Sequence, residues 1–118
     1  MEVDSKKLQE LYIAYFGRPA DPPGIQYWLS QASRGVKLRE IACHLSIQDE
    51  YRKSIIYGKS LDFQINQLYL NLFSRKVDFA VLSYWLSSIK SGSSDITDLA
   101  CDLIGSLSNL SQSNNEQQ

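Results

Sequence analysis

Two arginine–aspartate pairs are the polar residues whose types and spacing could form a binding site. Arg18 lies three residues before Asp21, and Arg75 lies three residues before Asp78, 57 positions further along the chain. An arginine can bind a carboxylate through two parallel hydrogen bonds, so each pair could form a recognition corner that grips a partner's carboxylate. Alternatively, the arginine ties the corner together while the aspartate caps the next helix, an interaction worth about 1 kcal/mol. The place of both aspartates directly before a predicted helix favours this structural interpretation.

Cys43, His44 and Cys101 are the residues that could bind a metal ion or form a disulfide. A zinc site needs several converging ligands, and neighbours in a helix point about 100° apart, so Cys43 and His44 are not expected to share a metal ion. Cys101 lies 58 positions after Cys43, which leaves a disulfide open, although two small buried thiols fit the pattern better. Calcium loops, nucleophile motifs and phosphate loops are absent. The sequence therefore predicts no catalytic residue, no metal site and no cofactor.

The arginine pairs belong to a helical unit that occurs twice. Residues 11–29 read as the end of a helix, a polar corner and the start of a second helix, and residues 68–86 repeat this plan at an offset of 57. We call residues 17–24, which end at Gly24, the first corner, and residues 74–81 the second corner. Apolar residues at helical spacing predict the packed side of each helix. The aromatic residues expected to anchor the core are Tyr12, Phe16, Tyr27, Trp28, Tyr69, Phe73, Tyr84 and Trp85.

The helical spacing, without any sustained alternation of a strand, predicts a single all-α domain over residues 1–107. We expect a compact bundle of about six to eight short helices built from the duplicated unit. Its parts are a first unit at about 5–45, a bridging helix at about 47–57, a second unit at about 61–107, and a polar tail at 108–118. The tail is low in complexity and is predicted to be disordered.

Helix ends can be placed from single residues. Asp4 or Ser5 is expected to begin the first helix, and Gly17 to end it. Asp21 is expected to cap the second helix by accepting from the backbone N–H of Gly24, because Pro22 and Pro23 have no such group. Asp78 is expected to cap its own helix in the same way.

Composition and charge exclude several classes of function. The chain has 118 residues, enough for one domain with a core. Its net charge of −1 argues against nucleic-acid binding, which depends on neutralising phosphates. No run approaches the roughly 18 apolar residues of a membrane span, and residues 1–7 lack the apolar centre of a Sec signal peptide. We therefore expect no nucleic-acid partner and no membrane span.

Residues 17–28, Gly-Arg-Pro-Ala-Asp-Pro-Pro-Gly-Ile-Gln-Tyr-Trp, resemble the bacterial domain of unknown function numbered 4214. That family's signature runs leucine-tyrosine, a short gap, glycine-arginine, an acidic corner with a glycine, and tyrosine-tryptophan, and residues 46–51 resemble its serine, glutamate, aromatic segment. The resemblance covers roughly residues 8–107, and the second corner departs from it at Ser74, Lys76 and Val81. A fainter similarity links the glycine-arginine corner and residues 50–52 to phycobilisome linker domains.

The resemblance implies a non-catalytic helical module, common in secreted or surface-associated bacterial proteins, including cyanobacterial ones. We expect a protein–protein interaction or assembly module, such as a structural component of a bacterial surface or large assembly, that binds a protein partner or itself and not a small molecule. The alternative is a small-ligand or glycan-binding domain that uses the tryptophan- and tyrosine-rich region. Most of the seven tyrosines, however, fall on apolar helix sides and are expected in the core. A cytoplasmic location is the alternative to a secreted one.

Overall fold

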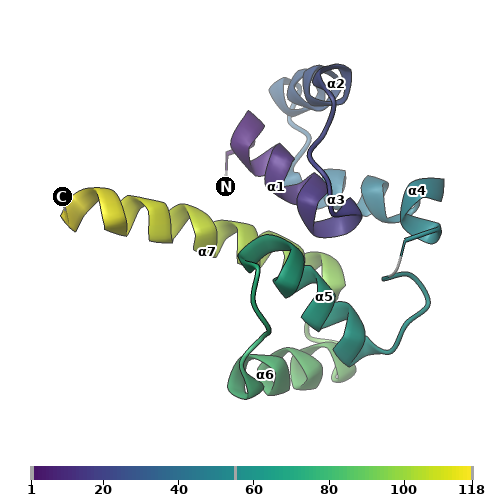
Figure 1. Ribbon diagram of the computed structural model, residues 1–118. Helices are drawn as coiled ribbons and strands as arrows, with labels where there is room; N and C mark the ends of the chain where they lie inside the picture. Colours follow the sequence, from purple (N-terminus) through teal and green to yellow (C-terminus); the bar gives the residue numbers. More distant parts are fainter. Residues whose placement is uncertain (1, 55, 118) are drawn as a thin grey trace.

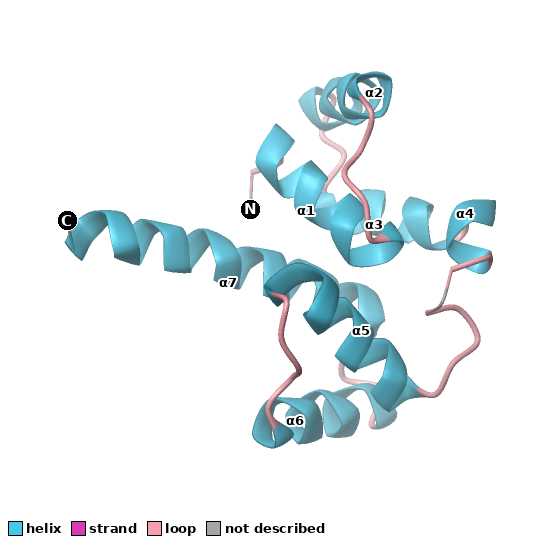
Figure 2. Cartoon of the chain, in the orientation of Figure 1, coloured by secondary structure: helices cyan, strands magenta, loops and turns pink. Residues whose placement is uncertain are grey.

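The computed structural model describes residues 2–54 and 56–117, with side chains described up to residue 107. Seven helices and no strand occur within these ranges, which confirms the predicted all-α class (Figures 1 and 2). The helices are α1 (Ser5–Phe16), α2 (Pro22–Ser33), α3 (Leu38–Ser46), α4 (Asp49–Arg52), α5 (Leu61–Phe73), α6 (Phe79–Lys90) and α7 (Ile96–Gln117).

Helix α1 begins and ends where the sequence indicates. The Asp4 carboxylate accepts from the backbone N–H of Lys7 at 2.8 Å, which satisfies one of the free N–H groups of the first turn. This bond is the main reason why the pKa of Asp4 lies below its ordinary value. Gly17 ends the helix in the left-handed conformation with φ 71°. Ser74 ends α5 in the same way with φ 59°, a conformation that a residue with a Cβ adopts at a cost.

Four helices form the core, in two pairs. Helix α1 packs on α5 and α3 packs on α7, so each pair joins elements at matching places of the two sequence units. Positions that correspond at the offset of 57 even touch, because the Asn71 side-chain amide donates to the Ala14 carbonyl at 3.0 Å. Contact between corresponding positions is what an approximate two-fold arrangement requires, whereas stacking of repeats would keep them apart. The largest fully buried side chains of the core include Leu8, Leu11, Tyr15, Ile41, Ile65, Leu68 and Ile104.

Helices α2 and α6 lie outside this four-helix core, at opposite ends of the molecule (Figure 1). Helix α2 packs mainly on α1, and α6 packs mainly on α5. Each of them has twelve residues and buries a single one, Trp28 in α2 and Trp85 in α6. The bounds of α6 equal those of α2 shifted by 57 positions. Partly buried apolar residues of both helices, among them Leu29 and Leu86, also pack against the core around these tryptophans.

The two units differ most after their third helix. The predicted bridging helix over 47–57 is wrong in length, because α4 covers only Asp49–Arg52. The Ser54 hydroxyl accepts from the backbone N–H of Ile56 at 3.3 Å, a local bond that competes with helix continuation. In the second unit no such break occurs, and α7 continues without interruption for 22 residues. Its last turns include residues 108–117 of the predicted tail, whose disorder in solution stays a prediction.

Candidate functional site

Arg18 holds the first corner together by binding a carboxylate that comes from α4. Its Nε donates to Glu50 Oε2 at 2.8 Å and its Nη2 donates to Glu50 Oε1 at 2.6 Å, the paired geometry that an arginine and a carboxylate favour. Nη1 also donates to the Pro19 carbonyl at 2.9 Å. The guanidinium lies 5.9 Å and 5.7 Å from the ring centres of Tyr12 and Phe16. The bond to Glu50 is the main reason why the pKa of Arg18 is raised.

The two aspartates of the corners do not cap their helices, so this prediction is wrong. Asp21 and Asp78 occupy the positions before α2 and α6, but neither carboxylate bonds a backbone N–H of its helix. Asp21 Oδ1 lies 3.2 Å from Arg18 Nη1, and Asp78 Oδ1 lies 3.9 Å from Arg75 Nη1. The prolines of α2 cannot be the whole reason, because α6 has none. The arginine three residues earlier is common to both corners, and each aspartate forms an exposed ion pair with it.

Gly24 allows a close contact inside the first corner. A Cβ at this position would stand 3.3 Å from the hydroxyl oxygen of Tyr12, a separation tighter than side chains normally keep. That hydroxyl accepts from the indole Nε1 of Trp28 at 3.1 Å, and both rings are buried. The first corner is also tied to α1 by Gln9, whose side-chain oxygen accepts from the backbone N–H of Ala20 at 2.8 Å. The first corner is thus closed by side chains of its own chain.

The second corner keeps the arginine over an aromatic ring but lacks these closing bonds. The Arg75 guanidinium lies 5.4 Å from the ring centre of Tyr69, and its side chain is 60% exposed. Val81 stands where the first corner has Gly24, and Tyr69 and Trp85 make no hydrogen bond with each other. Within the described residues, the 3.9 Å approach to Asp78 is the only ion pair of Arg75.

A cavity of about 370 Å³ lies beside Arg75, and we call it the second-corner groove. This volume falls in the range of small-ligand and side-chain binding sites. Its aromatic lining comes from α5 and α6, and its charged lining comes from Arg75 of the second corner and Asp102 of α7. The residues that line the groove are Tyr69, Phe73, Arg75, Val81, Tyr84, Trp85, Asp102, Leu103 and Ser106.

The aromatic residues predicted to anchor the core divide into three groups. Tyr12, Trp28, Tyr69 and Trp85 are buried, whereas Phe16 and Phe73 are half-buried against the core. Tyr27 and Tyr84 are 56% and 65% exposed, so the prediction that they anchor the core is wrong. Each precedes a buried tryptophan, and successive residues of a helix point about 100° apart, so both cannot face the core. Their rings instead meet the edges of the neighbouring tryptophan rings.

Arg39 joins the third helices of the two units, a contact that sequence reasoning missed. Its Nε donates to Asp98 Oδ1 at 2.9 Å and its Nη2 donates to Asp95 Oδ2 at 2.7 Å. The two aspartates also accept from each other's backbone N–H groups at 2.9 Å, which satisfies the start of α7. Arg39 is the main cause that lowers the pKa of Asp98. The aspartates stand three residues apart before an apolar run, and this spacing could have indicated the reciprocal bonds.

The cysteines and the histidine do not form a site of their own. Cys43 and Cys101 are free thiols, and the expectation that both are buried is wrong for Cys43, which is exposed on α3. Burial raises the pKa of Cys101 to about 11. His44 packs on Trp28, with ring centres 5.7 Å apart. Among the residues that the structure describes, no three histidine, cysteine, aspartate or glutamate side chains gather where they could hold a metal ion.

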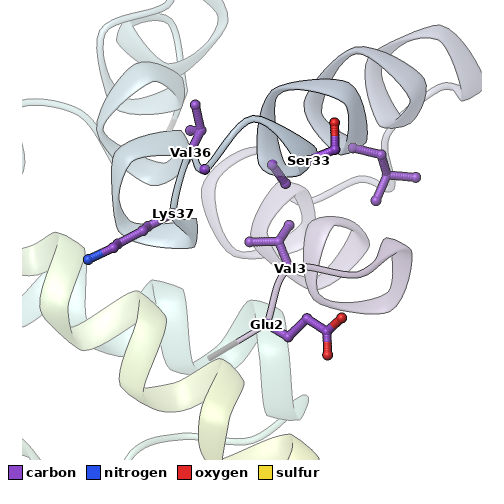
Figure 3. Close-up of a pocket in the computed structure, with 8 residues that line it drawn as sticks. Glu2, Val3, Ser33, Val36 and Lys37 are labelled. Carbon is purple, nitrogen blue, oxygen red and sulfur yellow. The ribbon is translucent and has the colours of Figure 1, made fainter.

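Another cavity, of about 390 Å³, lies between the N-terminal segment, the end of α2 and the start of α3 (Figure 3). Val3, Leu29 and Val36 give it an apolar lining. Glu2, Ser33 and Lys37 give it a polar part, but the charged ends of Glu2 and Lys37 point away from each other (Figure 3). The second-corner groove is therefore the better candidate, because charged and aromatic side chains meet there.

Fold and site define an all-α domain with two arginine corners, one closed by its own chain and one bordering a groove. Comparisons with known protein families, with curated proteins and with solved structures found no match for this chain. Within the described residues, no helix has the length and apolar character needed to cross a membrane.

Proposed function

We propose that this chain is a non-catalytic interaction or assembly module, built from a duplicated helical unit, that binds a protein partner or further copies of itself. The observation that carries the proposal is the exposure of large apolar side chains on the two outlying helices. Phe79 at the start of α6 is 83% exposed, and Tyr27 on α2 and Tyr84 on α6 are more than half exposed. Contiguous exposed apolar patches mark surfaces that bind other proteins, and two of these three side chains belong to α6.

The placement of these helices supports an assembly function. Helices α2 and α6 lie at opposite ends of the four-helix core (Figure 1), so exposed Tyr27 on α2 and exposed Phe79 and Tyr84 on α6 belong to different parts of the surface. A protein with two such regions can bridge two partners or form chains and rings through repeated head-to-tail contacts. The resemblance to the 4214 domain family, with its surface-associated members, agrees with such a function.

The test is the mass of the protein in solution as a function of concentration. Analytical ultracentrifugation of the wild-type chain should show association that is weakened in the double variant Phe79→Ser/Tyr84→Ser. Both side chains are exposed, so the variant should fold normally with a stability change within about 0.5 kcal/mol. Lys90→Ser at the other end of α6 is the matched control and should associate like the wild type.

If the wild-type chain stays monomeric at millimolar concentration, self-association is excluded and the partner must be a different protein. In that case, a partner isolated from the native source should lose affinity for the double variant and keep it for the Lys90→Ser control. If the wild-type chain is monomeric and every isolated partner binds the double variant equally well, the proposal is refuted.

A second candidate function, a small-ligand or glycan-binding domain, is favoured by one observation. The second-corner groove combines the aromatic rings of Tyr69, Phe73 and Trp85 with the polar groups of Arg75 and Asp102. Aromatic faces with flanking hydrogen-bonding groups suit a hydroxylated ring. A shift of the melting temperature with a sugar or metabolite, lost in Trp85→Ala but not in Trp28→Ala, would favour this candidate over the first.

A further inference from the structure

The first corner contains an internal complex between an arginine and an acidic segment. Glu50, in the single turn of α4, binds Arg18 through two hydrogen bonds of 2.8 Å and 2.6 Å, although the two residues are 32 positions apart. The chain reaches this position because α3 ends at Ser46 and the backbone turns into α4. The first corner therefore shows which chemical group an arginine of this corner type binds when a segment crosses it.

The second corner has the same arginine without the acidic segment. The position that corresponds to Glu50 at the offset of 58 is Ser108, which has no charge. Helix α7 also continues past the position that corresponds to the end of α3 (Figure 1), so the second unit has no short helix in the place of α4. The side chain of Arg75 is 60% exposed, against 42% for Arg18.

The second-corner groove lies where a counterpart of α4 would lie in the second unit. It is bordered by Asp102, Leu103 and Ser106 of α7, and these positions correspond to His44, Leu45 and Gln48, the residues that lead into α4 in the first unit. Its cavity of about 370 Å³ is large enough to take side chains of a crossing peptide.

We propose that the second-corner groove binds an acidic segment of a protein partner, whose carboxylate pairs with Arg75 as Glu50 pairs with Arg18. This inference rests on the proposed function, since it names the chemistry that the partner presents. The aromatic rings of Tyr69 and Trp85 contact the aliphatic part of the acidic side chain. Asp102, which also lines the groove, accepts from an N–H group of the same segment and repels a second carboxylate there.

The chain itself supplies a probe for this site. A peptide copying residues 46–54, with acetylated and amidated ends, carries Asp49, Glu50, Arg52 and Lys53, so its net charge is zero and bulk attraction is small. Binding is followed in the full-length protein by the NMR signal of the Trp85 indole N–H, because this ring lines the groove and has no hydrogen bond to Tyr69. Addition of the peptide should shift this signal and leave that of Trp28 in place.

Three comparisons test the role of the carboxylate and of the arginine. A peptide with Glu50→Gln should bind about tenfold more weakly or worse, since a charged hydrogen-bonded pair is lost. Arg75→Met in the protein should have an effect of the same size. Lys76→Met, which removes the same charge one residue further along, should change the affinity less than about twofold, because a single exposed charge is screened.

Equal binding of the two peptides, or equal binding by the Arg75→Met variant, would overturn the proposal, as would absence of any Trp85 shift at millimolar peptide. Free glutamate that binds as tightly as the peptide would also overturn it, in favour of a small carboxylate ligand. If the chain associates through α6 but does not bind the peptide, only the acidic-segment inference is refuted. If the chain binds the peptide but no protein partner exists, the proposed interaction function is refuted.

Discussion

The hydrogen bond between Tyr12 and Trp28 gives a stability difference between two corresponding positions of the chain. The indole Nε1 of Trp28 donates to the Tyr12 hydroxyl at 3.1 Å, and the two side chains are 7% and 8% exposed. Tyr12→Phe removes the acceptor and leaves the indole N–H buried without a partner. Leaving a buried donor unpaired costs about 1–3 kcal/mol. We therefore expect Tyr12→Phe to lower the free energy of unfolding by about 2 kcal/mol.

The matched control is Tyr69→Phe in the second unit. Tyr69 is as buried as Tyr12, at 7% exposed, but makes no hydrogen bond with Trp85. This substitution should change stability by less than about 0.5 kcal/mol. In urea unfolding followed by circular dichroism, a loss of about 2 kcal/mol lowers the midpoint by about 1 M if the m value is near 2 kcal/mol per M. Equal midpoints for the two variants would refute the reasoning.

Trp28→Ala should leave a cavity in the core and lower the free energy of unfolding by about 3–5 kcal/mol. Thermal unfolding measures this loss, and an unchanged melting temperature would contradict the assignment of Trp28 to the core. The pKa of Asp98 should be found below 3.8 in an NMR titration and should rise in Arg39→Met. Because the folded pKa is depressed, this carboxylate stabilises the fold above about pH 4, and its contribution is lost as the pH falls through the folded pKa. At pH 8, iodoacetamide should label the exposed Cys43 before Cys101, whose burial raises its thiol pKa to about 11, and labelling at equal rates in peptide mapping would contradict this.

Local patterns in the sequence predicted local structure well. Asp4 and Gly17 were sufficient to bound α1, because a cap bond and a left-handed glycine involve neighbours within a few residues. The burial of Trp28 and Trp85 also followed from their matched places on apolar helix sides. These features depend on spacing within one helix, which the sequence displays directly.

Contacts between distant residues were not predictable in the same way. Glu50 closes the first corner because α4 folds back over the end of α1, and nothing in the spacing of Arg18 and Glu50 indicates that geometry. The failed cap at Asp21 has a similar cause, since the sequence does not show which of two donors, a backbone N–H or a guanidinium, the carboxylate will take. The exposure of Tyr27, in contrast, could have been predicted from the 100° step between it and Trp28.

The bond between Asn71 and Ala14 has a consequence for how the two halves of the chain can pair. At the axis of a true homodimer the same amino acid must stand on both sides. Two alanines at this place would offer no side-chain donor. Two asparagines would need room for two amide side chains, whereas here one amide lies beside an alanine whose side chain is fully buried. Because the two halves belong to one chain, the two positions need not carry the same residue, and here one supplies the donor and the other the acceptor.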